Sequence, residues 1–172
     1  RILKNMFLLH ETRVSDVMTP RPVVFSLPES LTVSEYFASH YDSRFSRIPV
    51  YAEDREQLTG FVLKDDLLLA QARSNTENAL QTYRRELPAL LDSTPLSDAF
   101  EDILHRRAHI MMIVDEYGGM EGIITLEDIL ETLLGLEIID ESDKTADMQQ
   151  HARRMWKKRA QAMGITLPKD NG

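Results

Sequence analysis

The chain contains an internal repeat. The sequence GFVLKDDL at residues 60–67 recurs as GIITLEDI at residues 122–129, an offset of 62. Two further blocks recur in the same order: residues 30–37 as 93–100 at an offset of 63, and residues 47–54 as 109–116 at an offset of 62. Self-similarity of this kind decides how the other patterns are read. A unit of about 60 residues is marginally stable alone, so we expect two related halves that pack against each other.

Both halves have the pattern strand, helix, strand, strand, helix. In the first half we expect strands at 23–25, 48–51 and 61–62, with helices that begin at Thr32 and near Asp65. In the second half we expect strands at 90–91, 110–114 and 122–124, with helices from Thr94 and over 126–134. This order predicts an α+β fold of two β-α-β-β-α repeats packed with pseudo-two-fold symmetry.

Capping residues and prolines refine this prediction. Thr32, followed by Glu35, is typical of a capping box, and Thr94 predicts a cap with Pro95 at the first helical position. Pro49 has no backbone donor, so we expect its strand at a sheet edge or in an irregular position. Core-facing helical residues are expected to be Val33, Tyr36, Phe37 and His40 in the first half and Leu96, Ala99, Phe100, Ile103 and Leu104 in the second, with Leu67, Leu68 and Leu69 exposed.

The patterns predict five segments. Residues 1–13 form a leading amphipathic helix, because apolar residues from Ile2 to Leu9 recur at helical spacing. We expect the repeats at 14–72 and 89–140, a linker at 73–88 and a charged tail at 141–172. An acidic block at 140–143 and basic residues over 153–159 are interpreted as solvated faces rather than partner sites.

Composition excludes several classes of protein. The net charge of −8 argues against nucleic-acid binding, which needs a concentrated basic surface. No apolar run in the sequence approaches the roughly 20 residues of a membrane-spanning helix. The chain has no cysteine, so disulfides and thiolate chemistry are excluded. The chain begins at Arg1 without a signal-like apolar core, and we expect it to be an internal piece of a longer protein.

Thr125 and Asp128 are the best candidates for site residues. A strand that ends at Ile124 places Thr125 at the cap and Asp128 at the third residue of the next helix. One interpretation is a structural capping box. The other is a nucleoside site, because a hydroxyl and a carboxylate at a strand-to-helix junction can bond the two hydroxyls of a ribose, while nearby backbone N–H groups meet phosphate. Spacing alone leaves both open.

The whole pattern resembles a known family. The repeat order, the segment DVMTPR at 16–21, the strand SRIPV at 46–50 and above all VDEYGGMEGIITLEDI at 114–129 are similar to a tandem CBS-domain pair. They look like the cytosolic pair of the CorC, hemolysin-like and cyclin-M membrane proteins. The likeness covers about residues 14–140.

The resemblance implies a regulatory module that binds an adenosine nucleotide, ATP or AMP, with Mg²⁺ carried by the nucleotide, in the cleft between the repeats. It also implies a homodimer at the cytoplasmic face of the membrane, a membrane-spanning domain before Arg1, and a role in magnesium or cobalt transport. A scaffold that dimerises without a ligand is the alternative.

The resemblance also assigns roles to individual residues. Thr125 and Asp128 would hold the ribose, Glu127 would face the metal or phosphates, and Arg47 from the other repeat would pair with phosphate. Thr94 and Ile110 would line the adenine pocket. Arg47 as a surface residue and Thr94 as a plain helix cap remain open.

The repeats differ at the ribose position. Leu63 stands where the second repeat has Thr125, although Asp66 matches Asp128. The sequence therefore predicts one good nucleoside site.

Other chemistries have weaker signals. His105 and His109 have helical spacing, but His109 falls where a strand should begin, so we expect no metal bound directly by the protein. The sequence has no nucleophile elbow or phosphate loop of the Gly-x-x-x-x-Gly-Lys type. Carboxylates near Asp115 and Glu127 are explained by a loop and a helix start. We expect no enzyme activity.

Overall fold

The computed structural model describes residues 10–138 and 145–164, in two compact units. We call Val24–Leu87 the first-repeat unit, and Arg1–Val23 with Pro88–Gly172 the second-repeat unit. Residues 14–23, at the start of the first repeat in sequence, thus belong to the same unit as the second repeat. The predicted leading helix at 2–9 and the acidic block at 140–143 lie outside the described residues.

The first-repeat unit is a three-stranded sheet with two α-helices. Its elements are β2 (Leu27–Pro28), α3 (Val33–His40), β3 (Arg47–Tyr51), β4 (Leu58–Leu63), α4 (Lys64–Ala72) and the 3₁₀ helix η2 (Leu80–Tyr83). The sheet order is β2-β3-β4, parallel between β2 and β3 and antiparallel between β3 and β4. Leu80, from the predicted linker, is fully buried in this unit's core with Tyr36 and Leu67.

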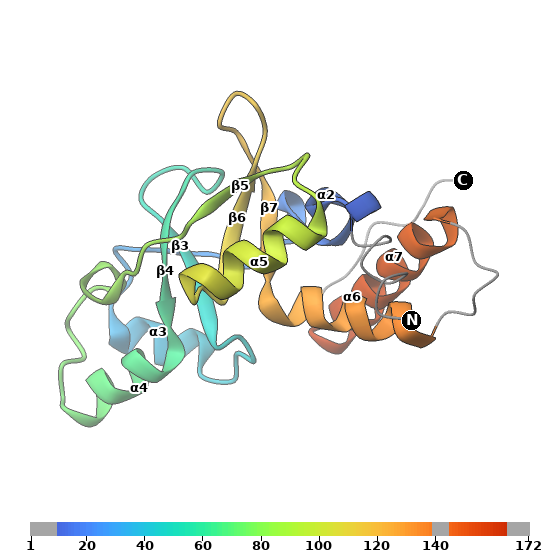
Figure 1. The fold of residues 1–172 in the computed structure, drawn as a ribbon. Helices are drawn as coiled ribbons and strands as arrows, with labels where there is room; N and C mark the ends of the chain where they lie inside the picture. The colour runs from blue at the N-terminus through green and yellow to red at the C-terminus, as the bar shows by residue number, and fades with distance from the viewer. Residues whose placement is uncertain (1–9, 139–144, 165–172) are drawn as a thin grey trace. The chain divides into compact units, whose positions relative to one another are not determined.

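The second-repeat unit repeats this arrangement and extends it. Its elements are α2 (Val14–Val17), β1 (Thr19–Pro20), the 3₁₀ helix η1 (Arg21–Val23), β5 (Ala89–Leu91), α5 (Leu96–Arg106), β6 (Ile110–Val114), β7 (Met120–Thr125), α6 (Leu126–Ile138) and α7 (Thr145–Ala162). The sheet order is β1-β7-β6-β5. In Figure 1, α5 passes in front of β6 and β7, on which it packs, and α6 runs beside α7. The core joins α2, α5, β6, β7 and α6.

The predicted α+β class and the β-α-β-β-α order of both repeats are confirmed. The strand predicted at 23–25 is wrong, because residues 21–23 form η1 and the strand is β2 at 27–28. Pro20 and Pro22 have no N–H to donate to a sheet. Pro20 is tolerated in β1 because β1 lies at the edge of its sheet, paired only with β7.

The offset between the two repeats changes from 63 to 62 along the sequence. The strand registers place this one-residue change in the hairpin loop of each repeat. Arg47 pairs opposite Leu63, and Ile110 pairs opposite Thr125. Arg47 therefore corresponds to Ile110 at an offset of 63, which corrects the offset of 62 expected for this block. The first repeat has residues 52–57 between β3 and β4, and the second has residues 115–119 between β6 and β7. The extra residue in the first loop accounts for this change.

Pro49 lies in the central strand of its sheet, not at an edge. The edge prediction is wrong. β2 pairs only with Val50 and Tyr51 of β3. No residue of β2 therefore lies opposite Pro49, and the N–H that proline lacks is not needed there.

The helix starts differ in how they are capped. Thr32 Oγ1 accepts from Glu35 N at 3.1 Å, which confirms the Thr32 half of the predicted capping box. Thr94 is not the cap of α5, which begins at Leu96 after Pro95. The chain itself covers this helix start, since Leu96 N donates to Thr12 O at 2.7 Å and Val14 N donates to Thr94 O at 2.9 Å.

Most of the predicted helix faces are correct. Val33, Tyr36, Leu96, Ala99 and Ile103 are buried, and Phe37, His40 and Phe100 are half-buried. Two leucines are wrong: Leu104 is 53 % exposed, while Leu67 is fully buried. Among the described residues, none of the helices is long and apolar enough to cross a membrane.

A backbone segment crosses one glycine in each repeat. A Cβ on Gly122 would overlap the carbonyl oxygen of Thr19, and a Cβ on Gly60 would lie 2.5 Å from the carbonyl oxygen of Arg85. Because only glycine leaves room for this approach, the repeated glycine is explained by packing.

Candidate functional site

The junction of β7 and α6 holds Thr125 and Asp128 in a reciprocal pair of hydrogen bonds. Thr125 N donates to Asp128 Oδ2 at 2.9 Å, and Asp128 N donates to Thr125 Oγ1 at 3.2 Å. Because α6 begins at Leu126, Thr125 caps the helix and Asp128 is its third residue, as predicted. Thr132 Oγ1 donates to Asp128 O at 2.8 Å and fixes the next turn.

Arg159 of α7 completes the surroundings of Asp128. Its Nη1 forms an ion pair with Asp128 Oδ1, and its Nε lies 2.8 Å from Glu131 Oε2. The Asp128 side chain is 5 % exposed and the Arg159 side chain 24 %. The Arg159–Glu131 approach is short but not aligned as a hydrogen bond, so neither of these two atoms has a bonded partner.

Burial controls the charges in this group. Burial lowers the pKa of Arg159, and the nearby carboxylate of Glu127 acts in the opposite direction. Burial also raises the pKa of Glu131, and repulsion from Glu127 adds to that effect. The poorly aligned contact with Arg159 does not offset the burial of Glu131.

Sequence reasoning missed Arg159. Interpreting the basic block as solvated is correct for Arg153, Arg154, Lys157 and Lys158, which are exposed, and wrong for Arg159. A signal was available: Met155, Trp156 and Ala160 follow helical spacing, and the structure places them half-buried or buried. Arg159 lies on that inward face.

The other predicted site residues separate into three places. Ile110 is buried opposite Thr125, and Glu127 is exposed on the first turn of α6. Thr94 lies before α5, where its carbonyl binds α2. Arg47, at the half-exposed start of β3, belongs to the first-repeat unit, and its role toward phosphate stays a prediction.

The corresponding junction in the first repeat lacks the hydroxyl. Leu63 precedes α4 and provides no side-chain cap. Asp66 instead accepts from Arg85 Nη2 at 3.0 Å and Nε at 3.3 Å. This pair is more open than the Asp128 pair, with side chains 30 % and 53 % exposed.

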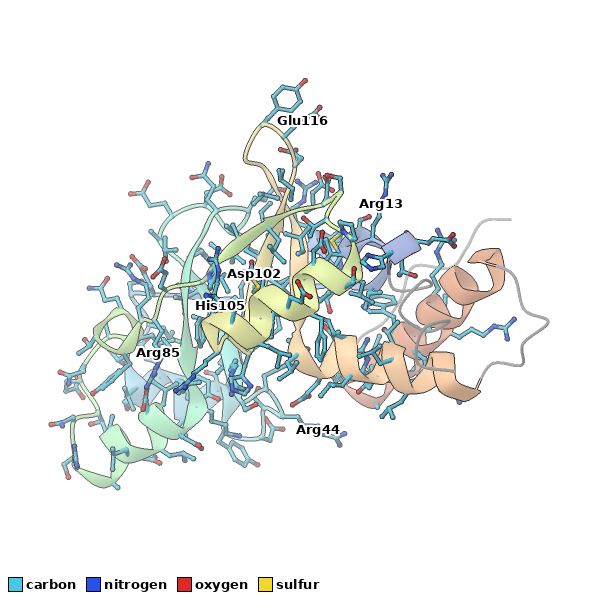
Figure 2. The ribbon with its side chains drawn as sticks, viewed as in Figure 1. Arg13, Arg44, Arg85, Asp102, His105 and Glu116 are labelled. Atoms are coloured by element: carbon cyan, nitrogen blue, oxygen red, sulfur yellow. The ribbon has the colours of Figure 1, made fainter. Side chains whose placement is uncertain are left out.

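The acidic loop between β6 and β7 is a turn. Asp115 Oδ1 accepts from Tyr117 N at 2.9 Å and Gly119 N at 2.8 Å, and Gly118 has a φ of 81°. Figure 2 shows Glu116 at the tip of this loop, pointing away from the sheet. These bonds give Asp115 a structural role in the turn.

The two histidines do not share a helix. Figure 2 shows His105 on α5, which ends at Arg106, and Arg107 turns the chain with a φ of 52°. The side chains that the structure describes contain no group of three or more His, Asp or Glu placed to hold a metal ion.

Comparison with known proteins identifies the family. The family model described as CBS domain matches residues 14–73 and 81–135. The chain belongs to the CBS-domain family. It carries two copies of the domain, at the two repeats read from the sequence, and each copy supplies one strand-to-helix junction with an aspartate.

The curated relatives of this CBS pair include a protein named for magnesium and cobalt efflux. The chain is 32 % identical to UPF0053 protein sll1254 of Synechocystis sp. over 90 % of this chain and 44 % of the relative. It is 30 % identical to the magnesium and cobalt efflux protein CorC of Escherichia coli K12 over 94 % of this chain and 56 % of the relative. The chain thus spans about half the length of these relatives.

A solved structure has a similar fold. The CBS domain of a bacterial CNNM/CorC family Mg²⁺ transporter in complex with ATP matches with a TM-score of 0.72 and 26 % identity. The match covers 78 % of this chain and 95 % of that chain. The predicted resemblance to the CorC and cyclin-M type of CBS pair is confirmed.

Proposed function

We propose that this CBS pair is a non-catalytic regulatory module that binds an adenosine nucleotide and controls a membrane protein of magnesium or cobalt transport. The observation that carries the proposal is the reciprocal Thr125–Asp128 pair at the start of α6. It combines a hydroxyl, a carboxylate and a helix N-terminus in one turn.

The donor set fits a nucleoside. A carboxylate accepts hydrogen bonds from vicinal hydroxyls, and a threonine hydroxyl that accepts from a backbone N–H still has its own O–H to donate. The buried apolar side chain of Ile110 lies opposite Thr125, where a flat base needs apolar contact. The first turn of α6 favours an anion through the positive end of the helix dipole.

The charges favour a nucleotide that carries a metal. Glu127, Asp128 and Glu131 lie on consecutive turns of α6 and would repel free phosphates. Mg²⁺ bound to the phosphates would reduce this repulsion, with Glu127 facing the metal. The Mg²⁺ is carried by the ligand rather than by a protein site.

The relatives support the wider role. The similar solved structure is a transporter CBS domain with ATP, and the curated relative CorC is a magnesium and cobalt efflux protein. In our proposal the module lies at the cytoplasmic face, attached to a membrane domain and paired with a second copy. The nucleotide favours one arrangement of the module and shifts the population of transporter states.

Isothermal titration calorimetry tests the proposal. Wild type should bind ATP or AMP, and Thr125→Val and Asp128→Asn should weaken binding at least about tenfold, because each removes a ribose contact. Asp66→Asn is the matched control in the first repeat and should leave binding unchanged. Titrations with and without Mg²⁺ show whether the metal enters with the ligand.

Two results would change the assignment. Absence of binding at millimolar ligand, in wild type and in Arg159→Ala alike, would overturn the proposal. The ligand-free scaffold would then remain, which Leu130 and Leu134 of α6 favour because they are 42 % and 60 % exposed. ATP turnover above a protein-free control, lost in Asp128→Asn, would instead indicate an enzyme.

A further inference from the structure

The Asp128 carboxylate is fully engaged within its own chain. One oxygen accepts from Thr125 N and the other is paired with Arg159. With the side chain only 5 % exposed, a ribose has no approach to this carboxylate while the pair is closed. A ligand that uses Asp128 must first displace the guanidinium.

The helix that carries Arg159 packs on α2 and α6. Among the described residues, the buried cluster of the second-repeat unit is made by side chains of α2, α5, β6, β7 and α6. Of the described side chains of α7, residues 153–162, Ala160 is buried, and Met155, Trp156 and Arg159 are half-buried. Release of α7 would expose this one face of α7 and would leave the members of that cluster in contact with one another.

The ion pair itself is suited to exchange. Arg159 faces Asp128 and Glu131, with Glu127 nearby, yet its contact with Glu131 is poorly aligned. Burial lowers the pKa of Arg159, which means that the environment disfavours its charged form. A half-buried arginine with one well-aligned partner stabilises the docked helix less than an arginine whose N–H groups are all hydrogen-bonded.

We propose that α7 is a removable cover of the nucleoside site, with Arg159 occupying the carboxylate of Asp128 that ribose hydroxyls would bind. The inference rests on the proposed function and adds a regulatory device to it. Docking of α7 and binding of the nucleoside are mutually exclusive, so each weakens the other by the same factor. Any event that draws α7 away would raise nucleotide affinity.

Binding measurements on the full chain test the cover. Arg159→Ala and Arg159→Met should bind both adenosine and ATP about tenfold more tightly than wild type, because the ribose contact is shared by both ligands. Arg153→Ala removes an exposed charge from the same helix and should change neither affinity. Tighter binding by the variant than by wild type, including binding only by the variant, supports the cover.

Other binding results overturn it. If Arg159→Ala weakens ATP but not adenosine, Arg159 is a phosphate ligand and not a cover. If wild type binds and the variant binds equally, the cover is wrong while the proposed function stands. If neither chain binds any adenosine ligand, both proposals fail.

Amide hydrogen exchange provides a test that needs no substitution. On addition of ATP to wild type, amides of α7 over 153–162 should exchange faster while those of β6 and β7 do not. Unchanged or slower exchange of α7 in the ATP complex would contradict the cover even if the Arg159 variants fail to fold.

Discussion

The β7–α6 and β4–α4 junctions have the same backbone plan but different side-chain chemistry. In each, a glycine on the second hairpin strand is crossed by a carbonyl, and an aspartate at the third helical position is paired with an arginine from a later segment. Only β7–α6 adds a capping hydroxyl, through Thr125, whereas Leu63 leaves the start of α4 without a side-chain cap.

The comparison separates the features that both copies need for folding from the features that occur in the second repeat alone. The glycine and the aspartate recur because both copies need the close crossing and an acid in the first helical turn. The threonine and the deep burial of Asp128 occur in one copy, and these are the features that a ribose site requires. A shared motif therefore does not imply two equal sites.

Removal of the two aspartates should have very different effects on stability. Asp128→Ala leaves Arg159 half-buried without its main partner and should lower the free energy of unfolding by about 3 kcal/mol. Asp66→Ala breaks an exposed pair and should cost less than about 1 kcal/mol. Urea unfolding measures both values. Equal losses would contradict the claim that the junctions differ in burial.

The glycines should show what the junctions share. Gly122→Ala and Gly60→Ala should each cost about 2 kcal/mol, because the added methyl group overlaps a backbone carbonyl oxygen. Thermal unfolding of the two variants, compared with wild type, gives the values. If only Gly122→Ala lowers the stability, the backbone at Gly60 accommodates the added methyl group. The two junctions would then not share the requirement for glycine.

The cap should contribute a smaller amount. Thr125→Val keeps the shape of the side chain but loses the acceptor for Asp128 N, and should cost about 1 kcal/mol. Thr125→Ser restores the hydroxyl and should recover most of the stability and the nucleotide affinity. If serine behaves like valine, the methyl group rather than the hydroxyl explains the threonine.

Two glutamates should give pH effects of opposite sign. Hydrogen bonds from Thr59 and Arg84 lower the pKa of Glu29 below 4.5, so its contribution is present above pH 4.5 and lost as pH falls through the folded-state pKa. The pKa of Glu131 is raised above 4.5, so stability is lost as pH rises through the shifted value. Glu29→Gln should therefore lower the free energy of unfolding more at pH 7 than at pH 3. Glu131→Gln should lower it less at pH 7 than at pH 3. Unfolding curves across this range check the signs.

Local patterns in the sequence predicted local structure well. The Thr125–Asp128 bonds follow from a three-residue spacing at a strand end, and the repeat order follows from recurring apolar blocks. The one-residue change of offset was placed too early in the sequence, because the similar acidic pairs Glu53-Asp54 and Asp115-Glu116 were aligned with each other. The two loops in fact differ in length by one residue.

Features that depend on distant contacts were not predictable in this way. Pro49 is allowed in a central strand only because β2 is two residues long. Arg159 meets Asp128 across a loop and a helix, and a basic block alone does not indicate which of its members faces inward. Thr94 does not form the expected cap because α5 begins at Leu96, which places Pro95 and not Thr94 at the cap position.

The number of adenosine nucleotides bound per chain tests the central claim most directly. Calorimetric titration of Arg159→Ala with ATP and Mg²⁺, where the site is uncovered, should give one nucleotide per chain, and adding Thr125→Val to this variant should weaken that binding at least about tenfold. Two nucleotides per chain, or one whose affinity is unchanged by Thr125→Val and is lost with Asp66→Asn, would contradict the assignment of the single working site to the second repeat.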